Sequence, residues 1–365
     1  MRLQVERARG DRGSRGGGRL SSVAVQVLTP EEVPGTGLGA TAVTIGGYDG
    51  VHLGHRRLLA ILREEADVRG VPAAVVTFDR HPATVIRPES APLLLTDSEQ
   101  KLELLASCGV DLTVIVRFDT ERANESAEDF VDEVLKGDLD AKVIVVGEDF
   151  HFGHGRKGNV ALLRQLGATA GFDVVGVALT TAGGSSGPVA GSPVPVLDGA
   201  AGAAPQPSDV VSSTRIRALV AEGDVAEAAR LLARPHEVRG VVVHGDGRGG
   251  PQLGMPTANV AVPGAMAVPA LGIYAGWFRR ADGSSHPAAV SVGVRPTFAS
   301  AGPHPAPLVE AHLIGFEGDL YGEHVGVAFV ERLRDERRFD RPADLAEQMW
   351  ADAAAARQVL EGAGG

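Results

Sequence analysis

The chain has 365 residues and a formal net charge of −11, from 46 acidic and 35 basic side chains, and it contains one cysteine. This length accommodates two or three domains with hydrophobic cores of their own. The acidic balance argues against a nucleic-acid partner, and a single cysteine excludes an internal disulfide framework and suits a reducing cytoplasm. No apolar run approaches the roughly 20 residues that cross a bilayer, so we expect a cytoplasmic protein with no membrane partner.

The N-terminal segment is rich in arginine and glycine and lacks the apolar core of a signal peptide. We therefore expect residues 1–22 to form a disordered extension. A basic anchoring or targeting segment is the alternative interpretation.

Strand-like and helix-like runs alternate between Ala40 and Leu179. The expected strands are residues 41–46, 71–78, 111–116, 142–147 and 172–179. The expected helices are residues 53–69, 99–107, 127–135 and 160–166. This alternation predicts a parallel sheet with helices on both faces, and ligands of such sheets bind beyond the carboxyl ends of the strands.

The most informative turn lies between the first of these strands and its helix, where Gly46-Gly47 ends the apolar run and His52-Leu53-Gly54-His55 opens the helix. A helix N-terminus presents unpaired N–H groups and the positive end of the helix dipole, which stabilise a polyphosphate. Gly54 leaves room for close approach, and two imidazoles can donate hydrogen bonds to phosphate oxygens as negative charge moves onto them. The pattern predicts nucleotidyl transfer.

A metal site is the alternative interpretation of these histidines. A second His-x-x-His, from His151 to His154, follows another expected strand. Four histidines from two strand ends would suffice to surround a metal ion, although no cysteine-rich context accompanies them.

Residues 183–207 hold six glycines, five prolines and a single charged residue, Asp198, a composition that cannot make a packed element. We expect a flexible insertion within the first domain. The following SSTRIR, residues 212–217, predicts a helix capped by Ser212 or Ser213. Arg215 and Arg217 lie in its first turns, and guanidinium groups match the geometry of phosphate. The segment is therefore interpreted either as a phosphate-binding site or as an ordinary helix cap.

Short β-rich runs separated by glycines follow Pro235 and predict a small antiparallel barrel. They cover residues 237–245, 257–262, 272–278, 287–294, 308–314 and 324–333. Residues 344–360 have helical spacing and are expected to pack on this barrel.

Two stretches of the barrel carry chemistry. Residues 244–254 contain five glycines, whose backbone N–H groups can surround phosphates, although a glycine-rich hairpin is the simpler alternative. Thr257 and Asn259 follow as alternate residues of one strand face and supply the hard oxygen donors that suit Mg²⁺. Glu310 is expected on the strand face opposite Val309 and Ala311. An ordinary solvent-exposed glutamate of a strand would show the same alternation.

Taken together, the motifs resemble a known enzyme family. GGYDGVHLGH (46–55), TFDRHP (77–82), VGEDFHFGHGRKG (146–158) and SSTRIR (212–217) resemble the adenylyltransferase half of bacterial bifunctional riboflavin kinase/FAD synthetase. The motifs GDGRGGPQLGMPTANV (245–260), GVRPTF (293–298), VEAHL (309–313) and DLYGEHVGVAFVERLRDERRF (319–339) resemble its riboflavin kinase half. The resemblance extends from about Val23 to about Gln358.

The resemblance implies a chain of α/β plus β class. A Rossmann-like parallel-sheet nucleotidyltransferase domain is expected at 23–234, with the insertion at 183–207, and a small antiparallel β-barrel riboflavin kinase domain with a C-terminal helix at 235–365. The implied reactions are phosphorylation of riboflavin by ATP to give FMN and ADP, and adenylylation of FMN by ATP to give FAD and pyrophosphate. Mg²⁺ is the implied metal, and a transient homo-oligomer is left open.

The resemblance also implies roles for individual residues. The implied catalytic residues are His52, His55, Arg215 and Glu310, the last as the base for the ribityl hydroxyl. In the adenylyltransferase, ATP is expected at Gly46, Gly54, Ser212, Ser213, Thr214 and Arg217, and FMN at Asp79, His81, Asp149 and Phe152. In the kinase, ATP is expected at Gly245, Gly247, Gly249 and Gly254, and Mg²⁺ at Thr257 and Asn259. Tyr48 departs from the family, which commonly has Phe there.

Two other functions compete with this one. The chain would also fit a related nucleotidyltransferase with an unrelated C-terminal barrel, although the PTAN and VEAHL motifs argue against it. A flavin- or nucleotide-binding regulator with decayed activity is the second, and the intact motifs argue against it.

Overall fold

The computed structural model describes residues 2–7, 21–33, 39–182, 209–245, 255–294 and 307–362. The chain divides into two compact units, the first made of Met1–Pro92 and Ser98–Val211 and the second of Leu93–Asp97 and Ser212–Gly365. The segment from Ser212 to residue 234, which we expected in the first domain, therefore packs with the second unit.

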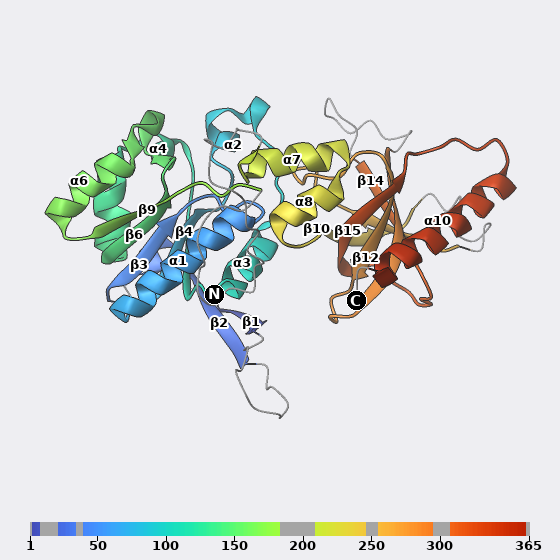
Figure 1. Ribbon diagram of the computed structural model, residues 1–365, viewed down its shortest axis with the longest axis horizontal. Coiled ribbons are helices and arrows are strands. Elements are labelled where there is room, and N and C mark those ends of the chain that lie inside the picture. Colours follow the sequence, from blue (N-terminus) through green and yellow to red (C-terminus); the bar gives the residue numbers. More distant parts are fainter. Residues whose placement is uncertain are drawn as a thin grey trace. The chain divides into compact units, whose positions relative to one another are not determined.

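The first unit is built on a seven-stranded sheet in the order β1-β2-β5-β4-β3-β6-β9 (Figure 1). Its strands are β1 Arg2–Arg7, β2 Ser21–Leu28, β3 Thr41–Ile45, β4 Ala73–Phe78, β5 Leu112–Val116, β6 Ala141–Gly147 and β9 Asp173–Val177. All neighbours from β2 to β9 pair in parallel, and β1 pairs antiparallel with β2. The predicted parallel sheet is confirmed.

Helices follow most of the strands of the first unit. They are α1 Leu53–Arg69, α2 Ala83–Ile86, α3 Ser98–Ser107, α4 Thr120–Asn124, α5 Ala127–Phe130, a π-helix at Val131–Asp138 and α6 Val160–Ala170. Short 3₁₀ turns occupy Pro30–Glu32, Pro88–Ser90 and His154–Arg156, and β7 His151–Phe152 pairs with β8 Gly158–Asn159.

Both faces of this sheet are buried, because successive strand residues point to opposite sides. Val43 and Ile45 of β3 join a core cluster with Phe130, Val131 and other residues of the segment that spans α5 and the π-helix. Ala42 belongs instead to a second cluster with residues of α1 and α3. Helices therefore cover the sheet on both sides, as the continuous apolar runs predicted.

The N-terminal segment differs from the expected disordered extension. Arg2–Arg7 forms β1 and pairs with residues Ser21 to Gln26 of β2. Leu3 and Val5 alternate with polar residues, a strand pattern that the arginine-rich composition obscured. Residues 8–20 lie outside the described part of the chain.

The second unit is a closed barrel in the order β10-β11-β14-β13-β12-β15 (Figure 1). Its strands are β10 His236–Val243, β11 Ala258–Ala261, β12 Gly272–Arg279, β13 Ser285–Val294, β14 Pro307–Leu313 and β15 His324–Arg334. All of its strand pairs are antiparallel. The helices are α7 Ser213–Glu222, α8 Val225–Leu232 and α10 Pro342–Gly362. The predicted barrel and C-terminal helix are confirmed.

Two helices are attached to the barrel by specific contacts. Val225 of α8 joins the core cluster of the barrel, which explains why this helix packs with the second unit. Ala356 and Leu360 of α10 pack against Ala275 on β12. Arg334 donates two hydrogen bonds to the Asp352 carboxylate of α10, at 2.8 and 2.6 Å, and this paired geometry fixes the helix in place.

The predicted insertion at 183–207 lies outside the described residues. Its flanks are paired with each other, since Thr181 forms a β-bridge with Val210 and Ala182 N donates to Asp209 O at 2.7 Å. In the described part of the chain, no helix has the length and apolar character needed to span a bilayer.

Candidate nucleotide sites

The loop after β3 holds its shape through an unusual backbone and one buried side chain. Tyr48, Gly50 and Val51 all have positive φ, at 49°, 83° and 40°, and such angles are costly for residues other than glycine. The Tyr48 ring lies in the core of the first unit, and its hydroxyl hydrogen-bonds to Thr44 Oγ1 at 2.7 Å. The hydroxyl that distinguishes Tyr48 from the family's Phe is thus bound inside the protein.

His52 and His55 stack against each other at the start of α1. Their ring centroids are 3.7 Å apart at an interplanar angle of 15°. His52 caps the helix, because its Nδ1 accepts a hydrogen bond from His55 N at 3.3 Å. An acceptor Nδ1 places the proton of neutral His52 on Nε2, so that Nε2 is a hydrogen-bond donor.

The His55 imidazole is held in its neutral form. Burial, and secondarily the neighbouring His52, lower the pKa of His55 well below its ordinary value of 6.5. Its Nδ1 is buried without a hydrogen-bond partner in the described residues. A buried polar atom without a partner is costly, which is a reason to expect a ligand or water there.

Gly54 leaves space that the His52 ring uses. A Cβ at this position would lie 3.2 Å from Cε1 and 3.3 Å from Nδ1 of His52. Gly46 is similarly restricted, since a Cβ there would lie 3.1 Å from the Tyr48 ring. Both glycines are therefore needed for the local packing of the loop and its histidines.

Asp79 and His81 follow the end of β4. Asp79 accepts hydrogen bonds from Phe118 N at 2.8 Å and from the Arg80 guanidinium. Burial alone would raise the pKa of Asp79, but these hydrogen bonds and the Arg80 charge outweigh it, and the pKa is lowered. His81 Nδ1 accepts from Ala83 N at 3.1 Å. Both side chains thus already have local hydrogen-bond partners.

Asp149 and Phe152, in the segment after β6, differ in their exposure to solvent. Asp149 is exposed, whereas Phe152 packs against the core cluster and lies 6.1 Å from the Phe130 ring. His151 and His154 bind backbone carbonyls through Nδ1. No group of three or more His, Cys, Asp or Glu side chains among the residues that the structure describes is arranged to hold a metal ion.

The SSTRIR segment forms the first turns of α7 in the second unit. Ser212 caps the helix, and its Oγ accepts from Arg215 N at 3.3 Å, as the capping interpretation predicts. Arg215 forms an ion pair with Glu227 at 3.4 Å, and its Nη1 is buried without a partner in the described residues. Arg217 Nε donates to Leu93 O at 2.7 Å, and Thr214 is exposed. Ser213 lies beside the cap in the first turn.

In the barrel, Asn259 on β11 and Glu310 on β14 are paired residues of neighbouring strands. Ala258, Val309 and Ala311 belong to the barrel core, so the alternation of a strand puts Asn259 and Glu310 on the other face. Asn259 Oδ1 is buried and lacks a hydrogen-bond partner in the described residues.

Gly245 packs closely against this pair of strands. A Cβ at Gly245 would lie 2.3 Å from Nδ2 of Asn259. A side chain at this position would therefore require the Asn259 side chain or the backbone after β10 to move. The other glycines predicted to bind ATP in the kinase, Gly247, Gly249 and Gly254, lie outside the described residues.

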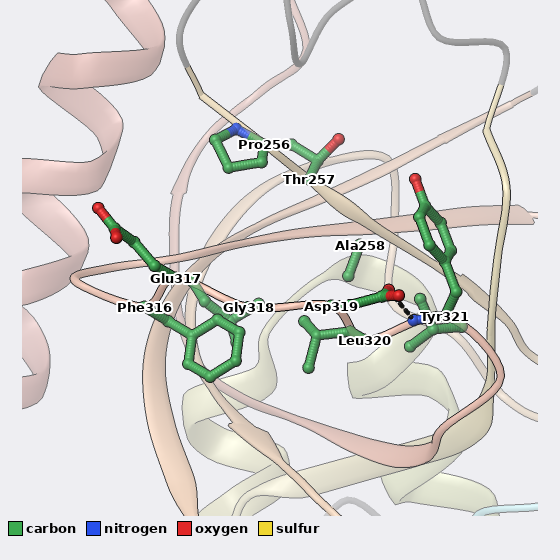
Figure 2. Close-up of a pocket in the computed structure, with 11 residues that line it drawn as sticks. Pro256, Thr257, Ala258, Phe316, Glu317, Gly318, Asp319, Leu320 and Tyr321 are labelled. Carbon is green, nitrogen blue, oxygen red and sulfur yellow. Dashed lines mark hydrogen bonds between the residues drawn. The ribbon is translucent and has the colours of Figure 1, made fainter.

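A pocket of about 540 Å³ opens beside Thr257 in the second unit. Figure 2 shows Pro256 and Thr257 on one side and the loop from Phe316 to Tyr321 on the other. Tyr321 N donates to Asp319 Oδ1 at 3.0 Å, and the Tyr321 ring stacks on His244 at 3.8 Å. Thr257 lines this pocket, but Asn259 and Glu310 do not.

Comparison with known proteins identifies the family of the chain. The family model for FAD synthetase matches residues 37–186, and that for riboflavin kinase matches residues 232–360. The bifunctional riboflavin kinase/FMN adenylyltransferase of Escherichia coli strain K12 is 35% identical over 318 residues, which cover 87% of this chain and 92% of the relative. The chain belongs to the bifunctional riboflavin kinase/FMN adenylyltransferase family.

A second relative and a solved structure also match most of the chain. The enzyme of the same name from Pseudomonas fluorescens is 38% identical over 316 residues, which cover 87% of this chain and 92% of the relative. The chain is also similar to the crystal structure of a macrolide-efflux protein from Streptococcus pneumoniae, with 27% sequence identity and a TM-score of 0.75. The match covers 91% of this chain and 99% of the Streptococcus pneumoniae chain. The relatives from Escherichia coli and Pseudomonas fluorescens and the two family models agree on the family.

Membership of the riboflavin kinase/FMN adenylyltransferase family confirms the resemblance inferred from the motifs, and it excludes an unrelated C-terminal barrel. Sequence reasoning missed the pocket loop, whose side chains include Phe316, Asp319 and Tyr321. The motif DLYGEHVG contained two of these residues, but no pattern indicated that they line a pocket with Thr257.

Proposed function

We propose that this chain converts riboflavin to FMN in its second unit and FMN to FAD in its first unit, with one ATP consumed in each reaction. The observation that supports this most directly is the separation of the motifs. The HLGH turn and the Asn259–Glu310 pair lie in different compact units, and each unit contains the match to one of the two family models. The cytoplasmic location expected from the sequence stays a prediction.

In the first unit, a phosphate oxygen of FMN would attack the α-phosphorus of ATP, and the bond to the departing pyrophosphate would break. This chemistry needs positioning and charge stabilisation and little covalent work by the protein. His52 Nε2 and the neutral His55 imidazole supply donors at the N-terminus of α1, where the helix dipole also favours anions. The phosphate-binding roles of Ser212, Ser213, Thr214, Arg215 and Arg217 stay predictions.

FMN is expected to bind the first unit beside the segments that follow β4 and β6. Asp79 and His81 follow the carboxyl end of β4, which is the edge where ligands of parallel sheets bind. Their predicted contacts with FMN, and those of Asp149 and Phe152, stay predictions. The core packing of Phe152 leaves Asp149 as the more exposed of the last two side chains.

In the second unit, the ribityl hydroxyl of riboflavin would attack the γ-phosphorus of ATP, and ADP would leave. Glu310 is proposed to accept the hydroxyl proton as a general base. Thr257 and Asn259 would hold Mg²⁺, because both offer the oxygen donors that this ion prefers and Asn259 Oδ1 has no partner among the described residues. Bound Mg²⁺ would offset the negative charge of the ATP phosphates.

The pocket beside Thr257 is the proposed ATP site of the kinase. Its volume of about 540 Å³ lies within the range of small-molecule sites. The Tyr321 ring, stacked on His244, offers an aromatic surface to the nucleotide, and the adjacent Gly245 allows the chain to approach Asn259 closely.

The test is incubation of the chain with ATP and Mg²⁺ and either riboflavin or FMN, followed by chromatographic separation of the flavins. We expect FMN and FAD from riboflavin, with ADP and pyrophosphate released, and FAD alone from FMN. A regulator with decayed activity would retain flavin without forming either product, and that result would refute the proposal.

A further inference from the structure

Lys101 is a residue that the motif analysis did not single out, although it reaches the same sheet edge as the HLGH turn. It lies on α3, and its Nζ donates to Phe78 O at 3.1 Å and to Thr77 Oγ1 at 3.3 Å, at the carboxyl end of β4. Thr77 Oγ1 in turn donates to Gly47 O at 3.4 Å. A chain of hydrogen bonds thus connects α3 to the loop that ends at His52.

The Lys101 ammonium also lies among carboxylates of this edge. Its charge interacts with Asp49, in the loop after β3, and with Asp79, after β4. Burial lowers the pKa of Lys101, and these two carboxylates partly oppose that effect. Asp49 itself is buried, with an exposed fraction of 7%. Carboxylates at an edge that must receive polyphosphates would repel the substrates unless cations offset them. Arg80 already pairs with Asp79 at 2.8 Å, and Lys101 adds a second positive charge that also interacts with Asp49.

Burying an ammonium costs free energy, and an apolar side chain of similar volume would often serve stability as well or better. The presence of a lysine at this position therefore needs a reason beyond packing. Its hydrogen bonds go to the end of β4, and its charge faces the loop that presents the two stacked histidines. Both features act on the proposed adenylyl-transfer site and neither acts on the barrel.

The geometry points to Lys101 as a positioning residue for adenylyl transfer. Its ammonium fixes the loop from Gly46 to His52 against the end of β4 and offsets the negative charge of Asp49 and Asp79 where the phosphates of ATP and FMN approach. This role rests on the proposed FMN adenylyltransferase activity of the first unit.

The test compares Lys101→Met, which removes the charge, with Lys101→Arg, which keeps it. A displaced catalytic group can cost about 10²-fold in rate, so we expect Lys101→Met to lower kcat/KM for FAD formation from FMN by about that factor. Lys101→Arg should stay within about tenfold of the wild type, and riboflavin phosphorylation should be unchanged in both. Separate kcat and KM values show whether positioning or substrate attraction is lost.

Two further variants keep the result interpretable. Lys142→Met is the matched control, because Lys142 also pairs with a carboxylate, Asp140 at 2.8 Å, but on a more exposed surface of the same unit. It should retain FAD synthesis. Lys101→Gln, which keeps a donor without the charge, is assayed in case methionine disturbs the fold, and it should show the same loss as Lys101→Met.

Wild-type kcat/KM in either uncharged variant, or an equal defect in folded Lys101→Arg and Lys101→Met, would overturn the assignment. Failure of the wild-type chain itself to make FAD from FMN would refute the proposed function instead, so the two failures are distinguishable.

Discussion

Asn259 and Glu310 stand directly opposite each other on β11 and β14, although they are far apart in the chain. Cross-strand partners share one face of a sheet. The residue predicted to hold Mg²⁺ and the residue predicted to accept the hydroxyl proton therefore lie side by side on the face of the barrel away from its core. A metal ligand beside a general base would suit transfer of a phosphoryl group to a hydroxyl, and both roles stay predictions.

The Mg²⁺ role of Asn259 predicts a specific defect. A lost contact with a charged group typically costs about 1.5–3 kcal/mol, which corresponds to about a 10- to 100-fold loss of affinity. Asn259→Ala should raise the Mg²⁺ concentration needed for half-maximal riboflavin phosphorylation by this factor. Titration of the kinase rate with Mg²⁺ measures it, and Asn259→Asp, which keeps an oxygen donor, serves as the control. An unchanged Mg²⁺ requirement in Asn259→Ala would remove this residue from the metal site.

Gly54→Ala should damage FAD synthesis without destabilising the protein. The added Cβ would lie 3.2 Å from the His52 ring and force it to move, and a small misplacement can cost about 10²-fold in rate. Alanine is also a better helix former than glycine, so the melting temperature should not fall. The measurement is FAD formation from FMN, with Gly264→Ala as the control because a Cβ there meets nothing within 4 Å. Full activity in Gly54→Ala would show that the ring position is not critical.

His55 predicts a pH dependence of stability. Its pKa in the folded protein lies well below the ordinary value of 6.5, so below pH 6.5 the unfolded chain binds the proton more readily than the folded one. Stability should therefore fall as the pH drops below about 6.5, by up to about 1.4 kcal/mol per pH unit from this group. Denaturant unfolding of the first unit at pH 7.5 and 5.5 should show a smaller pH effect in His55→Gln than in the wild type. An identical pH effect in both would contradict the lowered pKa of His55 in the folded protein.

Removal of Gly184 to Pro205 should leave both activities and the melting temperature near wild type. The flanks of this segment are paired through Thr181 and Val210, so a short connection can join them, and the free energy of loop closure changes only slowly with length. Thermal melting and chromatography of both products provide the measurement. A selective loss of FAD synthesis would show that the removed residues contribute to the first site.

Periodicity and capping patterns predicted most of the longer elements, but not short helices such as α2 and α4. The helix expected at 53–69 is observed at Leu53–Arg69, because His52 caps its start and Gly70 adopts the left-handed conformation at its end. By contrast, β1 escaped prediction because the arginine-rich composition obscured the alternation of Leu3 and Val5 with polar residues. The packing of Val225 with the barrel core was likewise not evident from periodicity.

The motifs indicated which side chains to consider, and their roles stay predictions, whereas the long-range contacts of the side chains were not predictable from sequence. The HLGH turn identified His52 and His55, but nothing in the pattern showed that Tyr48 would bind Thr44 or that Phe152 would pack against the core. Lys101 reaches β4 from a helix that looks ordinary in sequence. Such contacts depend on how elements are brought together, which spacing along the chain does not record.

The most direct test of two separate catalytic sites is the reciprocal pair His55→Ala and Glu310→Gln, each assayed with riboflavin and with FMN. His55→Ala should slow FAD formation by about 10² to 10³ and leave riboflavin phosphorylation near wild type. Glu310→Gln should slow riboflavin phosphorylation by about 10² to 10⁴ and still convert added FMN to FAD. Equal loss of both reactions in either folded variant would contradict the assignment of one reaction to each unit.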